Sequence, residues 1–137
     1  MNRVVISYTP DADLVGWLRI DVETPRFKGN GEFWASPSLI KDFADSLSQY
    51  PISDENHPEL RCGYGQSKVD DVIISLGIKP ADALGALKIN LNVSDHVDRD
   101  SRLQTHFIAH CPNIERFQRQ LFSLLAGARD DAVLESS

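Results

Sequence analysis

The chain has 137 residues, of which 42% are hydrophobic and 25% are charged, and this composition fits one folded domain and excludes intrinsic disorder. Twenty aspartates and glutamates against fourteen lysines and arginines give a formal net charge of -6, which argues against a nucleic-acid partner and favours a basic protein partner. No apolar run reaches the roughly 20 residues that span a bilayer, and no leader-peptide pattern precedes the first apolar segment. We therefore expect a cytoplasmic protein with no membrane contact.

Three strands are predicted at the start of the chain. Residues 4–7 are rich in β-branched side chains, and the next segment alternates at a period of two, with Leu18, Ile20 and Val22 on one side. Residues 28–31, Lys-Gly-Asn-Gly, have the composition of a hairpin turn. A third strand that contains Phe33 is expected after this turn.

The apolar period changes after the third strand and predicts a helix. Ser36 is a favourable N-cap because its hydroxyl can accept from the first helical turn, and Pro37 suits the first helical position. Tyr50-Pro51 is expected to end the helix. The apolar stripe of this helix consists of Ile40, Phe43 and Leu47.

The same order of segments recurs in the second half of the chain. Residues 72–75 resemble residues 4–7, and residues 85–91 match residues 16–22 at an offset of 69 (85 minus 16). The second helix starts at Pro112, stops at Gly127 and repeats the apolar stripe at an offset of 74. Its stripe consists of Ile114, Phe117, Leu121 and Leu124.

We predict an α+β fold in which duplicated β-β-β-α units form a six-stranded, mainly antiparallel sheet with two helices on one face. Residues 1–137 form a single domain, with the internal repeat in residues 3–50 and 70–127. Residues 51–69 are predicted as a connecting loop with a short strand near Leu60, and residues 128–137 as a tail.

The sheet face opposite the helices is the candidate functional surface. Strand alternation places on it the residues between the core positions, which include both tryptophans of the chain among charged groups. Two interpretations remain open: the tryptophans form a cross-strand pair that protects the sheet, or they anchor a partner. The candidate partner-binding residues are Trp17, Arg19, Asp21, Glu23, Glu32, Trp34, His106 and His110.

No catalytic, cofactor or metal motif stands out from the sequence. His106 and His110 lie four residues apart on a predicted strand, roughly 13 Å along it, which is too far for a shared metal ion. Cys111 follows His110 directly, so the two side chains would point to opposite sides of a strand. Cys62 and Cys111 show no CxxC spacing and are expected to be reduced thiols. We expect no cofactor, no metal and no enzymatic activity.

The layout resembles the WapI-type immunity proteins. The resemblance lies in Gly16-Trp17-Leu18-Arg19-Ile20-Asp21-Val22, a helix that ends near Tyr50-Pro51, Gly85-Ala86-Leu87-Lys88-Ile89-Asn90-Leu91 and a closing amphipathic helix, and it covers about residues 3–126. Proteins of that family are small, bacterial and cytoplasmic, and each neutralises the toxic domain of a cognate contact-dependent toxin. The resemblance implies a basic toxin domain as partner and carries over no individual functional residue.

Three hypotheses of function follow from these observations. The first is a non-enzymatic protein-binding domain, with toxin neutralisation as its specific form, in which Asp21, Glu23 and Glu32 meet basic groups around the two tryptophans. The second is a small-ligand-binding or enzymatic domain that uses the edge with His106 and His110. The third is a homodimer that associates through a sheet face or edge.

Overall fold

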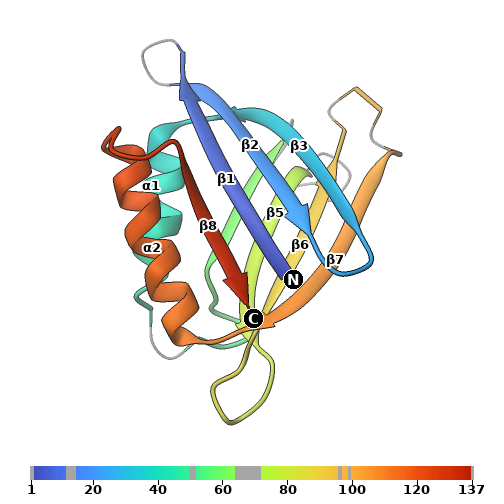
Figure 1. Cartoon of the computed structure of the whole chain (residues 1–137), viewed down its shortest axis with the longest axis vertical. Coiled ribbons are helices and arrows are strands. Elements are labelled where there is room, and N and C mark those ends of the chain that lie inside the picture. The colour runs from blue at the N-terminus through green and yellow to red at the C-terminus, as the bar shows by residue number, and fades with distance from the viewer. Residues whose placement is uncertain are drawn as a thin grey trace.

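The computed structural model describes residues 2–11, 15–49, 52–63, 72–95, 97–98 and 100–136. These residues form eight strands and two helices (Figure 1). The predicted order of three strands and a helix occurs twice, and each time a further strand follows the helix. The elements are β1 (Asn2–Pro10), β2 (Gly16–Glu23), β3 (Lys28–Ala35), α1 (Pro37–Ser46), β4 (Glu59–Gly63), β5 (Val72–Pro80), β6 (Leu87–Ser94), β7 (Arg102–Ala109), α2 (Cys111–Leu125) and β8 (Asp131–Ser136).

The strands form two antiparallel sheets of four strands, so the α+β class is confirmed and the single six-stranded sheet is wrong. The first sheet has the order β3-β2-β1-β8, and the second, written from its opposite edge, has the order β7-β6-β5-β4. The last strand of each half therefore joins the sheet of the other half. Residues 131–136, expected to be part of a tail, form β8, and the short strand near Leu60 is β4.

The core lies between the two sheets and the helices. Inward-facing side chains of both sheets, such as Ile6, Ile20, Leu76 and Ile89, are fully buried in one continuous cluster with residues of both helices. Burial of each such side chain contributes roughly 1.5–3 kcal/mol to stability. Because the inner faces point at each other, the two outer faces look in opposite directions.

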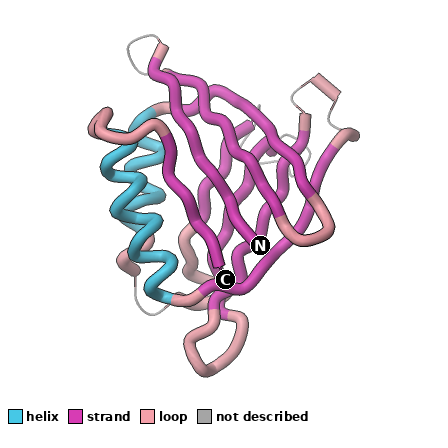
Figure 2. Tube along the Cα trace, viewed as in Figure 1, coloured by secondary structure: helices cyan, strands magenta, loops and turns pink. Residues whose placement is uncertain are grey.

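The helices lie together at one side of the strands, and they do not cover one face of a sheet as expected (Figures 1 and 2). Helix α2 packs against β8 and β1, and α1 packs against β4 and α2. The reason is that β8 and β4 each add an edge strand to a sheet, and each helix packs against one of these two strands. The two helices thus close the side of the core near β8 and β4.

The predicted helix boundaries agree with the structure at three of the four ends. The Ser36 hydroxyl accepts from the backbone N–H of Leu39, and Pro37 is the first residue of α1. Helix α2 starts at Cys111, one residue before the proline, and Gly127 follows it with a φ of 78°. Helix α1 ends at Ser46, before residues 50–51, which lie outside the described residues.

The prediction of a hairpin turn at residues 28–31 is wrong, because these residues belong to β3. The chain reverses at Thr24, whose backbone N–H donates to the carbonyl of Phe27 at 2.8 Å. Gly29 and Gly31 instead face the other sheet, where a Cβ on Gly29 would lie 3.0 Å from Leu103 and one on Gly31 would overlap Val93. The glycines therefore let β3 lie close against β6 and β7, which a hairpin reading of the sequence could not reveal.

Candidate functional site

The structure divides the predicted binding face between two surfaces. Trp17, Arg19, Asp21 and Glu23 on β2, with Glu32 and Trp34 on β3, all lie on the outer face of the first sheet. His106 lies on β7, on the outer face of the second sheet. His110 is the residue before α2. The prediction of one shared face is wrong because the two halves form separate sheets whose outer faces point away from each other.

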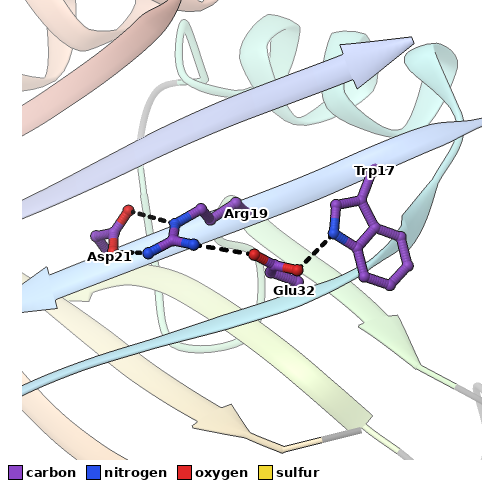
Figure 3. Close-up of polar contacts among 4 residues, drawn as sticks. All are labelled: Trp17, Arg19, Asp21 and Glu32. Atoms are coloured by element: carbon purple, nitrogen blue, oxygen red, sulfur yellow. Dashed lines mark hydrogen bonds and ion pairs between the residues drawn. The ribbon is translucent and has the colours of Figure 1, made fainter. Parts of the chain in front are cut away.

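Four polar side chains on β2 and β3 form a connected network (Figure 3). The Trp17 indole Nε1–H donates to Glu32 Oε2 at 2.6 Å, and Arg19 Nη1 donates to Glu32 Oε1 at 3.0 Å. Arg19 also donates from Nε and Nη2 to both oxygens of Asp21, each at 3.1 Å. The hydrogen bonds that Arg19 donates to Asp21, together with the charges of Asp21 and Glu32, raise the pKa of the Arg19 guanidinium above its ordinary value. The guanidinium is thereby held between two carboxylates.

The two tryptophans face each other across the β2–β3 pair. Trp17 is directly opposite Trp34 in the register, and the ring centroids are 4.7 Å apart with the planes inclined at 72°. This edge-to-face contact is the cross-strand pair that the first interpretation expected. Trp34 nevertheless remains 47% exposed, whereas Trp17 is half-buried. The pair therefore both stabilises the sheet and presents an indole to solvent.

Glu23 is peripheral to this network. Its carboxylate lies 4.0 Å from the Lys28 ammonium, and both side chains are largely exposed. Asp21 and Glu32 are already paired with Arg19, so the three carboxylates do not form an uncompensated acidic patch. The sequence showed the residues of this face but not the pairing, because the pairing depends on the register between β2 and β3.

The outer face of the second sheet bears a concave surface with a volume of about 690 Å³. Its floor includes buried Gly77, and a Cβ added at this glycine would lie 3.8 Å from the His57 ring. His57 Nε2 lies 3.3 Å from Glu59 Oε2, and Glu59 also pairs with Arg61 at 3.2 Å. Sequence analysis singled out His106 among the residues that line this surface but did not identify His57 or the surface itself. The residues that line it are Asp54, His57, Glu59, Ser75, Gly77, Lys79, Pro80, Ala81, Lys88, Asn90, His106 and Ile108.

His106 and His110 both border a separate hollow of about 470 Å³ next to the start of α2. Both side chains are exposed, and the backbone N–H of His110 donates to Asn113 Oδ1 at 2.9 Å, which caps the helix. Among the residues that the structure describes, no three histidine, cysteine, aspartate or glutamate side chains gather as ligands for a metal ion. The geometry at His110 is accounted for by its place before a helix.

The two cysteines lie in contrasting environments. Cys62 points into the core from β4, and burial raises the pKa of its thiol to about 12. Cys111 is exposed at the first residue of α2. A buried thiol with such a pKa carries almost no thiolate at neutral pH, so Cys62 acts as a core residue.

Comparison with known proteins does not assign the chain to a family. No family model matches the sequence, and no curated protein matches it. Within the described ranges, no helix combines the length and the apolar character needed to cross a membrane.

Proposed function

We propose that this protein binds another protein through the outer face of β2 and β3, with Trp34 and Trp17 as its anchors. The observation that carries the proposal is the exposed indole of Trp34, held edge to face against Trp17. Tryptophan and arginine are the residue types most enriched at the energetic centres of protein interfaces. Here both tryptophans of the chain and Arg19 lie on two neighbouring strands.

The network around the tryptophans supports binding because it fixes the surface before a partner arrives. Glu32 holds the Trp17 indole through one oxygen and Arg19 through the other, so neither side chain must be ordered on association. Immobilising a flexible side chain at an interface costs about 0.5–1.5 kcal/mol, and this face avoids part of that cost. Because the polar groups of this face are hydrogen-bonded to one another, the face is better suited to binding a partner than to catalysis.

A basic protein is the proposed partner. The net charge of -6 steers cationic surfaces towards the whole molecule, although the carboxylates beside the tryptophans are compensated locally by Arg19. Neutralisation of a toxin domain is the specific form of this proposal that the immunity-protein resemblance implies. Steering by net charge acts on the association rate, whereas the indoles contribute the affinity.

The experiment uses the fact that the chain has only two tryptophans, both on this face. Products of the neighbouring genes are purified and titrated into the protein while its tryptophan emission and acrylamide quenching are followed. A partner without tryptophan, or one labelled with a tryptophan analogue, keeps the signal specific. Protection of the emission from quenching, with a saturable change, is the expected result.

Matched variants identify the surface. Trp34→Ala is expected to weaken binding at least about tenfold, because truncated anchor residues typically cost 2 kcal/mol or more. Phe122→Ala removes an aromatic side chain that is 39% exposed on α2, and should leave the affinity unchanged. Equal affinity of both variants and the wild type would exclude the β2–β3 face.

Light scattering of the protein alone tests the homodimer hypothesis. If a homodimer forms through the outer face of β2 and β3, Trp34→Ala should dissociate it.

A further inference from the structure

The concave outer surface of the second sheet is organised in cross-strand rows. Lys79 on β5 is directly opposite Lys88 on β6, and Lys88 is opposite Ile108 on β7. The adjacent row places Gly77, Asn90 and His106 side by side. Opposed side chains in such a pair have their Cβ atoms about 4.5–5.5 Å apart, and both lysines line the same concave surface.

Like charges directly opposite each other on neighbouring strands destabilise the pair, and an anion bound between them would offset this repulsion. Both side chains are half-buried. Across the parts of the chain that the structure describes, neither ammonium forms an ion pair and the side chains of Ser75, Asn90 and His106 have no hydrogen-bond partner. The outer face of the first sheet is different, because there Trp17, Arg19 and Glu32 satisfy one another.

The two sheets can be compared position by position through their registers. Phe33 is opposite Leu18, and Phe107 is opposite Ile89. Since Phe33 and Phe107 are 74 residues apart, as the helix stripes are, β2 and β6 correspond at an offset of 71 (89 minus 18) rather than at the offset of 69 predicted from the sequence. Trp17 therefore corresponds to Lys88 (88 minus 17 gives 71) rather than to Ala86. The location of the Trp17–Trp34 pair on the first sheet is therefore occupied by Lys88 and Ile108 on the second, and Lys79 takes the place of Thr9.

The acidic residues of the surface lie towards one side of it. Glu59 on β4 is held by Arg61 and by His57, so its charge is compensated. Asp54 precedes β4 and accepts from His57 through its backbone carbonyl. Lys79, Lys88 and the apolar Ile108, which is 41% exposed, form the part nearest Pro80. This part combines positive charge with an apolar wall.

We propose that this surface binds a small organic anion, with its carboxylate or phosphate group between Lys79 and Lys88 and its apolar part against Ile108. Asn90, Ser75 and His106 would donate hydrogen bonds to further oxygens of the ligand. The volume of about 690 Å³ falls in the range of small-molecule sites. The site is independent of the proposed protein-binding face, because it lies on the opposite sheet.

The test is a titration of the isotopically labelled full chain at constant ionic strength, followed by amide NMR. The probes are inorganic phosphate, phenyl phosphate and benzoate. Comparing phenyl phosphate with benzoate distinguishes a phosphate from a carboxylate ligand, and comparing phenyl phosphate with inorganic phosphate measures the contribution of the apolar ring. Saturable shifts of the amides of residues 77–79 and 88–90 are expected with phenyl phosphate or benzoate, and weaker binding with inorganic phosphate. Tryptophan emission should remain unchanged, so failure here and failure of the protein-binding proposal are distinguishable.

Variants that each remove one positive charge, at the site or away from it, provide the control. Lys88→Gln and Lys79→Gln are each expected to weaken binding of the better probe at least about tenfold, while their amide spectra remain those of the folded protein. Lys28→Gln removes the same charge from an exposed position on the first sheet and should not change the affinity. An equal loss in Lys28→Gln, the absence of saturable shifts with all three probes, or tighter binding of a hexaglutamate peptide would each overturn the proposal.

Discussion

Phe43 on α1 and Phe117 on α2 contact each other edge to face, with ring centroids 6.3 Å apart and planes inclined at 68°. The two residues are 74 positions apart (117 minus 43), the offset that relates the two helices, so α1 and α2 meet through the same position of each unit. Both rings are buried, with exposures of 3% and 0%. This contact joins the two halves of the chain inside one core.

Truncation of either ring is expected to destabilise the protein strongly. Phe43→Ala and Phe117→Ala should each lower the free energy of unfolding by about 3–5 kcal/mol, because each removes a buried ring and leaves a cavity. The double variant should show a coupling of about 0.5–1.5 kcal/mol from the ring contact. Urea unfolding followed by circular dichroism measures all three values. Phe122 also lies on α2 but is 39% exposed, so Phe122→Ala is the control and should lower the free energy of unfolding far less.

The close approach of β3 to the second sheet depends on Gly31. Gly31→Ala is expected to lower the free energy of unfolding by about 1–3 kcal/mol, because the new methyl group overlaps the Val93 side chain. Adding Val93→Ala creates room for that methyl group, so the double variant should be less destabilised than the sum of the two single variants. Thermal and urea unfolding of the three proteins provide the comparison.

Gly77→Ala is the matched control for this effect. Gly77 also lies in a strand, but its added Cβ would meet only His57, at 3.8 Å, which is ordinary contact. This variant should therefore be nearly neutral or slightly stabilising, since alanine restricts the unfolded chain more than glycine does. Equal destabilisation at both glycines would contradict the close packing of β3.

Local patterns in the sequence were sufficient for the helices and most strands. The i, i+3, i+7 stripe through Ile40 and Phe43, the Ser36 cap and the stop at Gly127 are each encoded within a few residues. The alternation in β2 and β6 is equally local. Such features depend on backbone geometry and side-chain period, which neighbouring residues determine.

The division into two sheets could not be predicted in the same way. It depends on β4 and β8, short strands that pair with the opposite half, β4 with β5 and β8 with β1. The alternation that places Leu60 and Cys62 on one side of β4 does not indicate which strand β4 pairs with. The opposition of Lys79 and Lys88 likewise requires the register between β5 and β6, and a register is a long-range property.

Strand β8 is expected to be essential to the fold. Its inward residues Ala132 and Leu134 are fully buried, and the backbone N–H of Val133 donates to Gln120 of α2 at 2.8 Å. Leu134→Ala should therefore cost about 2–5 kcal/mol. Glu135→Ala, which changes a neighbouring outward position, should cost less than about 1 kcal/mol. Chemical unfolding that gave equal values for these two variants would show that residues 131–136 behave as a tail.

The thiols should differ in reactivity. Cys111 is exposed and is expected to react with a disulfide reagent in the native protein, whereas Cys62 should react only after unfolding. Burial raises the pKa of the Cys62 thiol to about 12, so the reactive thiolate is scarce. Counting reacted thiols with and without urea, in the wild type and in Cys111→Ser, measures the difference. Fast labelling of native Cys111→Ser would contradict the burial of Cys62.

The same pKa predicts a loss of stability at alkaline pH. Below about pH 9 the thiol holds its proton in both states, and between about pH 9 and 12 only the unfolded thiol releases it, so the free energy of unfolding falls as the pH rises. The contribution approaches about 1.4 kcal/mol per pH unit. Cys62→Ala lacks this term, so its stability relative to the wild type should improve between about pH 8 and pH 10. A constant difference would contradict the raised pKa.

The two tryptophans should report different environments although they touch. In Trp17→Phe the remaining Trp34, which is 47% exposed, should be quenched efficiently by acrylamide and emit at longer wavelength. In Trp34→Phe the remaining Trp17 should be better shielded, because its indole is half-buried and bonded to Glu32 at 2.6 Å. Glu32→Ala removes that acceptor and should change the emission of Trp17 much more than that of Trp34, when introduced into each single-tryptophan protein. Equal quenching constants in the two proteins would mean that Trp34 is not the exposed member of the pair, and the proposed anchor would then be lost.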